Sequence, residues 1–116
     1  MTLDIRALEE AGKAVEEAHK TLQTLLEQRT TLVIGQRENE IVLEEFGYLN
    51  ATEDVVMKQV GPTLIKEELD AAKQNVQHRL EFMANELKSL DAKIDATQKI
   101  CTAAETKLQQ MQSSLK

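Results

Sequence analysis

The sequence of 116 residues contains few of the residues on which a compact globular core depends. Aromatic residues make up 3% of the chain, and tryptophan is absent. Four glycines and one proline leave little room for loops. No stretch approaches the roughly 20 consecutive apolar residues that a membrane-spanning helix requires. These shortages argue against a compact globular enzyme and a membrane protein, and they favour a coiled coil.

Cysteine and basic residues are also scarce. Cys101 is the single cysteine, so no intrachain disulfide can form, and a reducing compartment is the simple expectation. The formal net charge is -6, which argues against a nucleic-acid partner because phosphate contacts need clustered lysine and arginine. The segment MTLDIRALEEAG contains acids and no long apolar run, so we expect no signal peptide. The expectation is a soluble cytoplasmic protein.

Both ends of the chain carry apolar residues at alternating spacings of three and four, which is typical of a coiled coil. We call each series a seam. The first seam comprises Leu8, Ala11, Val15, Ala18, Leu22, Leu25, Arg29, Leu32, Gln36, Asn39, Leu43 and Phe46. The second comprises Leu69, Lys73, Val76, Leu80, Met83, Leu87, Leu90, Ile94, Thr97, Cys101, Ala104, Leu108, Met111 and Leu115. The pattern predicts helices over 1–46 and 67–116, packed as a long antiparallel two-helix coiled coil.

The segment 47–66 interrupts the helical pattern. Its DVVMKQV run is rich in β-branched residues, and TLIK follows Gly61 and Pro62. Glycine can adopt positive φ at the first central position of a type II′ turn, and proline fixes φ at about -65° at the second. We therefore predict a connector and one β-hairpin here, so that 1–116 forms a single, mostly α domain of helix, hairpin and helix.

The predicted hairpin has no core of its own within one chain. An isolated two-stranded hairpin is marginally stable in water, and both of its edges lack partners. We therefore expect it to join strands of other chains in a closed or larger sheet. The candidate assembly residues are Val55, Val56, Met57, Val60, Gly61, Pro62, Leu64 and Ile65.

The fold-back would bring the two termini together, far from the hairpin. Counting residues outward from the hairpin along both helices places Leu3 near Gln112 and Leu8 near Lys107. Helix ends fray, and methionine is flexible enough to contact varied partners. The apolar residues of this tip either close the coiled coil or bind an unfolded polypeptide. They are Leu3, Ile5, Leu8, Leu108, Met111 and Leu115.

Three polar residues, Arg29, Gln36 and Asn39, interrupt the first seam. A polar residue in a coiled-coil seam can fix the register at a cost in stability. The alternative is local loosening that lets the helices splay. The outward count places Arg29 level with Glu86, and we expect the two to pair.

No set of residues indicates catalysis, a metal site or a cofactor. Cys101 lies on the second seam without an adjacent base, so a packed thiol is the simple interpretation. His19 and His78 occupy outer helical positions without ligand partners at metal-binding spacing. The chain also lacks a glycine-rich phosphate loop. We therefore expect a protein that is not an enzyme.

The central part of the sequence, from Asn39 to Ile94, resembles the prefoldin family, and within it the β class of subunits. The strand ends in Lys58-Gln59-Val60-Gly61, and Pro62 then precedes an apolar strand that ends in Lys66. Further landmarks are Asn75-Val76, Arg79-Leu80, Glu86-Leu87-Lys88 and, upstream, Asn39, Val42 and Glu45. Phe46 stands where the family usually has leucine.

The resemblance implies an ATP-independent co-chaperone. Two α-class and four β-class subunits would form a hetero-hexamer, with the hairpins in a double β-barrel and the coiled coils as tentacles. The tips would hold unfolded actin and tubulin for delivery to the cytosolic group II chaperonin. The alternative function is that of a structural coiled-coil subunit of another scaffold or tethering complex, although such a rod needs no exposed β-edge.

Overall fold

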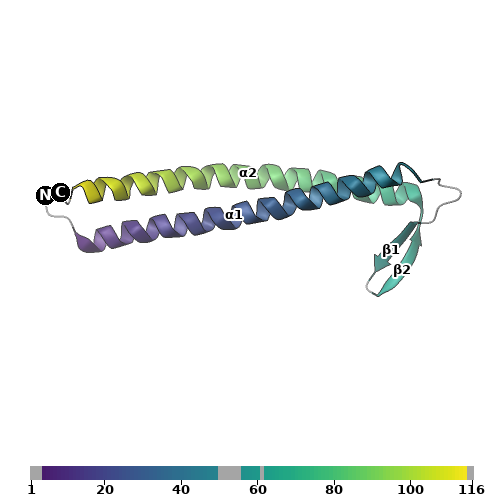
Figure 1. The fold of residues 1–116 in the computed structure, drawn as a ribbon, viewed down its shortest axis with the longest axis horizontal. Coiled ribbons are helices and arrows are strands. Elements are labelled where there is room, and N and C mark those ends of the chain that lie inside the picture. Colours follow the sequence, from purple (N-terminus) through teal and green to yellow (C-terminus); the bar gives the residue numbers. More distant parts are fainter. Residues whose placement is uncertain (1–3, 50–55, 61, 115–116) are drawn as a thin grey trace. The chain divides into compact units, whose positions relative to one another are not determined.

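Two long helices flank one β-hairpin in the computed structural model (Figure 1). The structure describes residues 4–49, 56–60 and 62–114, with the backbone alone for 58–60 and 64–67. The elements in chain order are α1 (Ile5–Phe46), β1 (Val56–Val60), β2 (Thr63–Glu67) and α2 (Leu69–Ser113). This arrangement confirms the predicted fold class of a two-helix coiled coil with a central hairpin.

The chain divides into two compact units, each built from both helices. Met1–Thr30 and Lys88–Lys116 form one, which we call the terminal unit. Thr31–Leu87 forms the other, which contains the hairpin and which we call the hairpin unit. Within each unit, α1 and α2 lie side by side and run antiparallel (Figure 1).

An acidic residue immediately precedes each helix. The Asp4 carboxylate accepts a hydrogen bond of 2.9 Å from the backbone N–H of Arg6, which satisfies a donor that the first turn of α1 leaves free. At the start of α2, the carbonyl of Glu68 accepts from the N–H of Ala72 at 2.9 Å. Asp70 lies in the first turn of α2, where a negative charge is favourable. The residues at the N-terminus of each helix therefore favour helix initiation there.

The two strands pair antiparallel around a two-residue connection. The facing residues are Val56 and Glu67, Met57 and Lys66, Lys58 and Ile65, Gln59 and Leu64, and Val60 and Thr63. The predicted hairpin ended one residue too early, because Glu67 pairs with Val56 in the sheet and α2 begins only at Leu69. Every facing pair joins an apolar residue to a polar or charged one. The hairpin therefore lacks the directly facing apolar pairs that stabilise a sheet from within.

Both predicted seams are confirmed at every position that the structure describes. All of these side chains are buried or half-buried. The buried ones are Ala11, Ala18, Leu69, Val76, Ile94 and Cys101, and Ala72 is a further buried residue that the seam did not include. Gly35 lies inside α1 without interrupting it. Leu115 lies outside the described residues.

Ile94 and Ile100 provide a matched test of this core. Ile94 is 8% exposed, whereas Ile100 on the same helix is 61% exposed. Ile94→Ala is expected to lower the free energy of unfolding by about 2 kcal/mol or more, because it removes buried apolar contacts. Ile100→Ala should leave it almost unchanged. Urea unfolding followed by circular dichroism measures both, and equal losses would contradict the placement of the core.

Polar contacts join the helices of the terminal unit. The Nε of Arg29 donates to Oδ1 of Asp91 at 2.7 Å, and His19 Nε2 lies 2.5 Å from Glu105 Oε1. The predicted partner of Arg29, Glu86, was therefore wrong. The outward count reversed the chain within the first strand, whereas the observed reversal lies at the later connection between the strands. His19 is exposed as predicted, but it is not isolated.

Asn39 makes a polar contact within the seam of the hairpin unit. Its Nδ2 donates to the carbonyl of Gly35 at 2.8 Å and lies 3.8 Å from the sulfur of Met83 on α2. A Cβ built on Gly35 would lie 3.4 Å from the terminal methyl of Met83, which is an ordinary van der Waals contact. The contact of Asn39 with Met83 and the bond of Arg29 to Asp91 join the two helices, which favours register control as the role of these two polar seam residues.

Candidate functional site

An apolar groove lies between α1 and α2 in the terminal unit. Its volume is about 320 Å³, near the lower end of the range for ligand pockets. Both helices contribute to its walls, and the lining residues are Ala7, Glu10, Ala11, Ala14, Ala103, Ala104, Lys107 and Met111. The groove is therefore a candidate site for an apolar side chain from another polypeptide.

Small side chains next to the seam create this groove. Ala7 and Ala14 each precede a seam residue by one position, namely Leu8 and Val15. A methyl group at these places fills little of the space beside the packed seam. Met111 supplies a longer and flexible wall, which can adapt to different occupants. The sequence thus forms a shallow apolar hollow without opening the coiled coil.

The structure places the predicted tip residues in different environments. Met111 lines the groove, and Ile5 is 71% exposed at the start of α1. Leu8 and Leu108 are half-buried on the seams and do not line the groove. Leu3 and Leu115 lie outside the described residues. The assignment of all six as client contacts remains a prediction.

Sequence reasoning missed the alanine walls of the groove. Ala7, Ala14 and Ala103 were not selected, because the search for client contacts favoured large apolar side chains. The sequence signal that could have revealed them is a small residue directly before a seam position on both helices. Glu10 and Lys107 add one charge of each sign to the lining, so the groove carries no strong charge preference.

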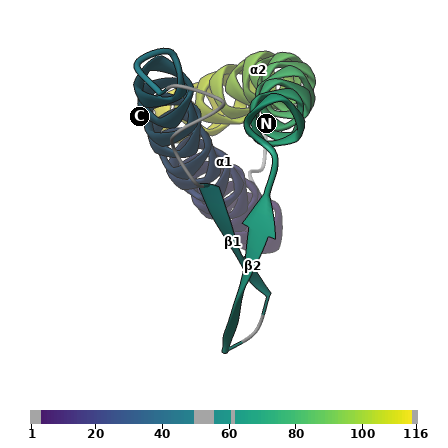
Figure 2. The ribbon, with the colours of Figure 1, turned by 90° about the vertical axis from the view of Figure 1, so that its right-hand side faces the viewer.

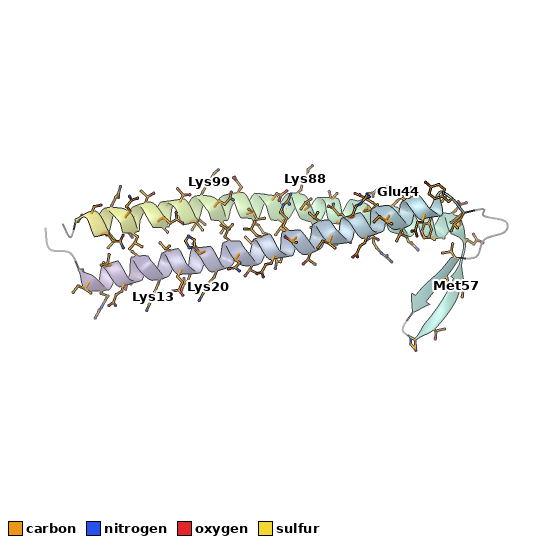
Figure 3. The ribbon with its side chains drawn as sticks, in the orientation of Figure 1. Lys13, Lys20, Glu44, Met57, Lys88 and Lys99 are labelled. Atoms are coloured by element: carbon orange, nitrogen blue, oxygen red, sulfur yellow. The ribbon has the colours of Figure 1, made fainter. Side chains whose placement is uncertain are left out.

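The hairpin is the second candidate site. It extends away from the ends of the two helices (Figure 2), and Met57 on β1 is 49% exposed (Figure 3). Pro62 is exposed and Val56 half-buried. For Val60, Leu64 and Ile65 the structure describes the backbone only. Val55 and Gly61 lie outside the described residues, and the predicted turn type, which depends on Gly61, lies outside them too.

The two strands leave both outer edges of this sheet without a partner strand. The sheet that the structure describes in 56–60 and 63–67 consists of β1 and β2 alone. Unpaired edges present rows of backbone N–H and C=O groups that readily pair with strands of another chain. The role of the hairpin residues in assembly remains a prediction.

The described residues offer little to catalysis or metal binding. No group of three or more His, Cys, Asp or Glu side chains among them could hold a metal ion. Cys101 is 5% exposed, which confirms its interpretation as a packed thiol. His78 is exposed. Within the same residues, neither helix has a stretch apolar enough to cross a membrane.

Two coiled-coil helices joined by a single β-hairpin define the structural class of this protein. The family model for the prefoldin subunit matches residues 9–114. The chain belongs to the prefoldin family, as its central motifs indicated, and is a subunit of this type of co-chaperone.

Curated relatives from animals and plants support this assignment. A probable prefoldin subunit 6 of Caenorhabditis elegans is 33% identical over 109 residues, which cover 89% of this chain and 86% of the relative. The corresponding protein of Drosophila melanogaster is 37% identical over 72% of this chain and 69% of the relative. Prefoldin subunit 6 of Arabidopsis thaliana is 40% identical over 70% of this chain and 59% of the relative.

A solved structure agrees with the fold. The crystal structure of the prefoldin beta subunit from Thermococcus strain KS-1 is similar with a TM-score of 0.80, and the match covers 90% of each chain. The sequence identity is 19%, so this similarity bears on the fold. It confirms the expected β-type arrangement of two helices and one hairpin.

Proposed function

We propose that this chain is a β-class subunit of a hetero-hexameric prefoldin with two α-class and four β-class subunits. Residues 1–116 act as one prefoldin-type domain in the cytoplasm. Family membership supports assembly with other prefoldin subunits. The complex requires no cofactor.

The hairpin joins the chain to its neighbours in an intersubunit β-barrel. Its register supports this role, because each facing pair leaves an apolar residue opposite a polar or charged one. A second layer or further strands would cover the apolar side chains. Pairing at both edges would also satisfy the free backbone groups.

The tip of the coiled coil holds unfolded polypeptide without nucleotide. The apolar groove of the terminal unit carries this proposal, because it offers an open, mostly apolar hollow with a volume of about 320 Å³. Unfolded chains expose the apolar side chains that such a groove binds. Unfolded actin and tubulin are the proposed clients, and the cytosolic group II chaperonin is the proposed acceptor.

Dilution of chemically unfolded actin into nucleotide-free buffer tests this function. The assembled complex that contains this chain should suppress light scattering by aggregating actin in proportion to its concentration. Addition of ATP should not change the result. Scattering equal to that of actin alone, or suppression that needs ATP, would contradict the proposal.

A further inference from the structure

The outer face of α1 in the hairpin unit carries an apolar stripe that the coiled coil does not use. Ile34, Ile41 and Tyr48 follow one another at intervals of seven residues, so they lie along one side of the helix. They are 53%, 40% and 88% exposed, respectively. The neighbouring seam residues are half-buried against α2. We call Ile34, Ile41 and Tyr48 the α1 stripe.

Backbone bonds continue the helical course of α1 to the end of this stripe. Beyond Phe46, the N–H of Tyr48 donates to the carbonyl of Glu45 at 3.0 Å. The N–H of Leu49 donates to the carbonyl of Phe46 at 3.2 Å. These tighter turns keep Tyr48 near the line of the two isoleucines. Leu49 is also exposed and extends the apolar surface towards the hairpin.

Acidic side chains border the α1 stripe. The positions three and four residues from Ile41 are adjacent to it on the helix surface, and three of these four are glutamates: Glu38, Glu44 and Glu45. The fourth is Arg37, whose Nη1 lies 3.4 Å from Glu40 and 3.9 Å from Glu44. Figure 3 shows Glu44 near the end of α1.

The charge of this region is therefore strongly one-sided. Residues 31–49 contain four glutamates and one arginine, with no lysine or aspartate. The single arginine interacts with carboxylates of its own helix. An apolar stripe with an acidic border is complementary to an amphipathic helix whose apolar face is flanked by lysine or arginine.

We propose that the α1 stripe is a second assembly contact, which binds a basic-flanked amphipathic helix of a neighbouring prefoldin subunit. The inference rests on the proposed assembly through the hairpin. The hairpin follows the same end of α1 along the chain, so a neighbour that pairs with β1 or β2 would lie near this end of the helix. The stripe is thus continuous along the chain with the proposed β-barrel contact, whose nearest described exposed residue is Met57.

The exposed apolar residues of α2 show no comparable arrangement. Phe82 and Ile100 are 63% and 61% exposed, but they lie 18 residues apart, and no other large apolar side chain in the described part of α2 is exposed. Single exposed apolar residues are common on protein surfaces and need no partner. They provide matched controls for the α1 stripe.

Paired substitutions in the full chain, assembled with its partner subunits, test the inference. Ile34→Gln with Ile41→Gln should raise the concentration at which the complex half-dissociates by about tenfold. Phe82→Gln with Ile100→Gln should change it by less than about twofold. Native mass spectrometry over a dilution series measures both, and circular dichroism verifies unchanged helix content. Equal effects of the two pairs would overturn the inference.

A photo-crosslinking residue in place of Ile41 identifies the occupant. The expected product joins this chain to a basic helix of another subunit, and the same residue in place of Ile100 should give no such product. Products with client or chaperonin alone, or none at all, would overturn the inference while leaving the proposed function intact. If the unaltered chain forms no complex with prefoldin subunits, both proposals fail.

Discussion

Replacement of Val60 and Ile65 by aspartate is expected to abolish hexamer formation while leaving helix content unchanged. Val60 faces Thr63 and Ile65 faces Lys58, so neither apolar residue has an apolar partner directly across the hairpin. Burial of an unpaired carboxylate in a barrel would require large desolvation, and aspartate also disfavours strands. Because the helices pack through separate seams, they should remain folded.

Native mass spectrometry and circular dichroism separate the two effects. Val60→Thr with Ile65→Thr keeps the β-branched shape but adds hydroxyl groups, so it should weaken assembly to an intermediate degree. Ile100→Glu adds a charge at an exposed helix position and should leave assembly unchanged. Normal hexamer formation by the aspartate variant would exclude the hairpin as the main assembly contact.

Met111→Lys is expected to weaken the holding of unfolded client by about tenfold without affecting assembly. The substitution places a charge in the wall of the apolar groove and removes a flexible apolar contact. Lysine and methionine have similar helix propensities, so α2 should remain intact. When one client binds several subunits of the same complex, loss of the contact with one subunit can lower the overall affinity by much more than the affinity of that single contact.

Binding of unfolded, fluorescently labelled actin to the assembled complex measures this effect. Gln112→Lys is the matched control, because it adds the same charge at the next, exposed position, which does not line the groove. Deletion from Leu108 onward should reproduce the loss while sparing assembly. If the deletion variant holds client at full strength, the tip of this subunit is not a main contact.

The sequence predicted the seams well because the alternating spacing of three and four marks the buried face of each helix. Arg29 and Asn39 illustrate this: the spacing assigned both to a seam despite their polarity, and both side chains are half-buried. The start of α2 was less predictable. Glu67 looked like the beginning of a helix, but its pairing with Val56 across the hairpin extends the second strand instead.

The partners across the coiled coil were harder to predict than the helices. Several registers bury the same seams, and the choice among them depends on where the chain reverses. An error of a few residues in that position moved the expected partner of Arg29 from Asp91 to Glu86. The hairpin register and the polar contact of His19 with Glu105 depend on which residues face each other after the chain reverses, and the sequence pattern does not specify this.

The groove was missed for a related reason. Alanines contribute little to an apolar pattern, so Ala7 and Ala14 look like ordinary helix formers in the sequence. They form a groove wall because Ala103 and Ala104 of α2 meet the same space. Such a coincidence depends on helix register, which the sequence pattern leaves open.

Affinity capture of the chain from its native lysate, followed by native mass spectrometry, tests the central claim most directly. The claim is that the hairpin makes this chain one subunit of a prefoldin hexamer. The expected result is a six-subunit complex whose components are two α-class and four β-class prefoldin chains. A homodimer, or a complex with one large protein of another family, would contradict it and favour a scaffold or tether.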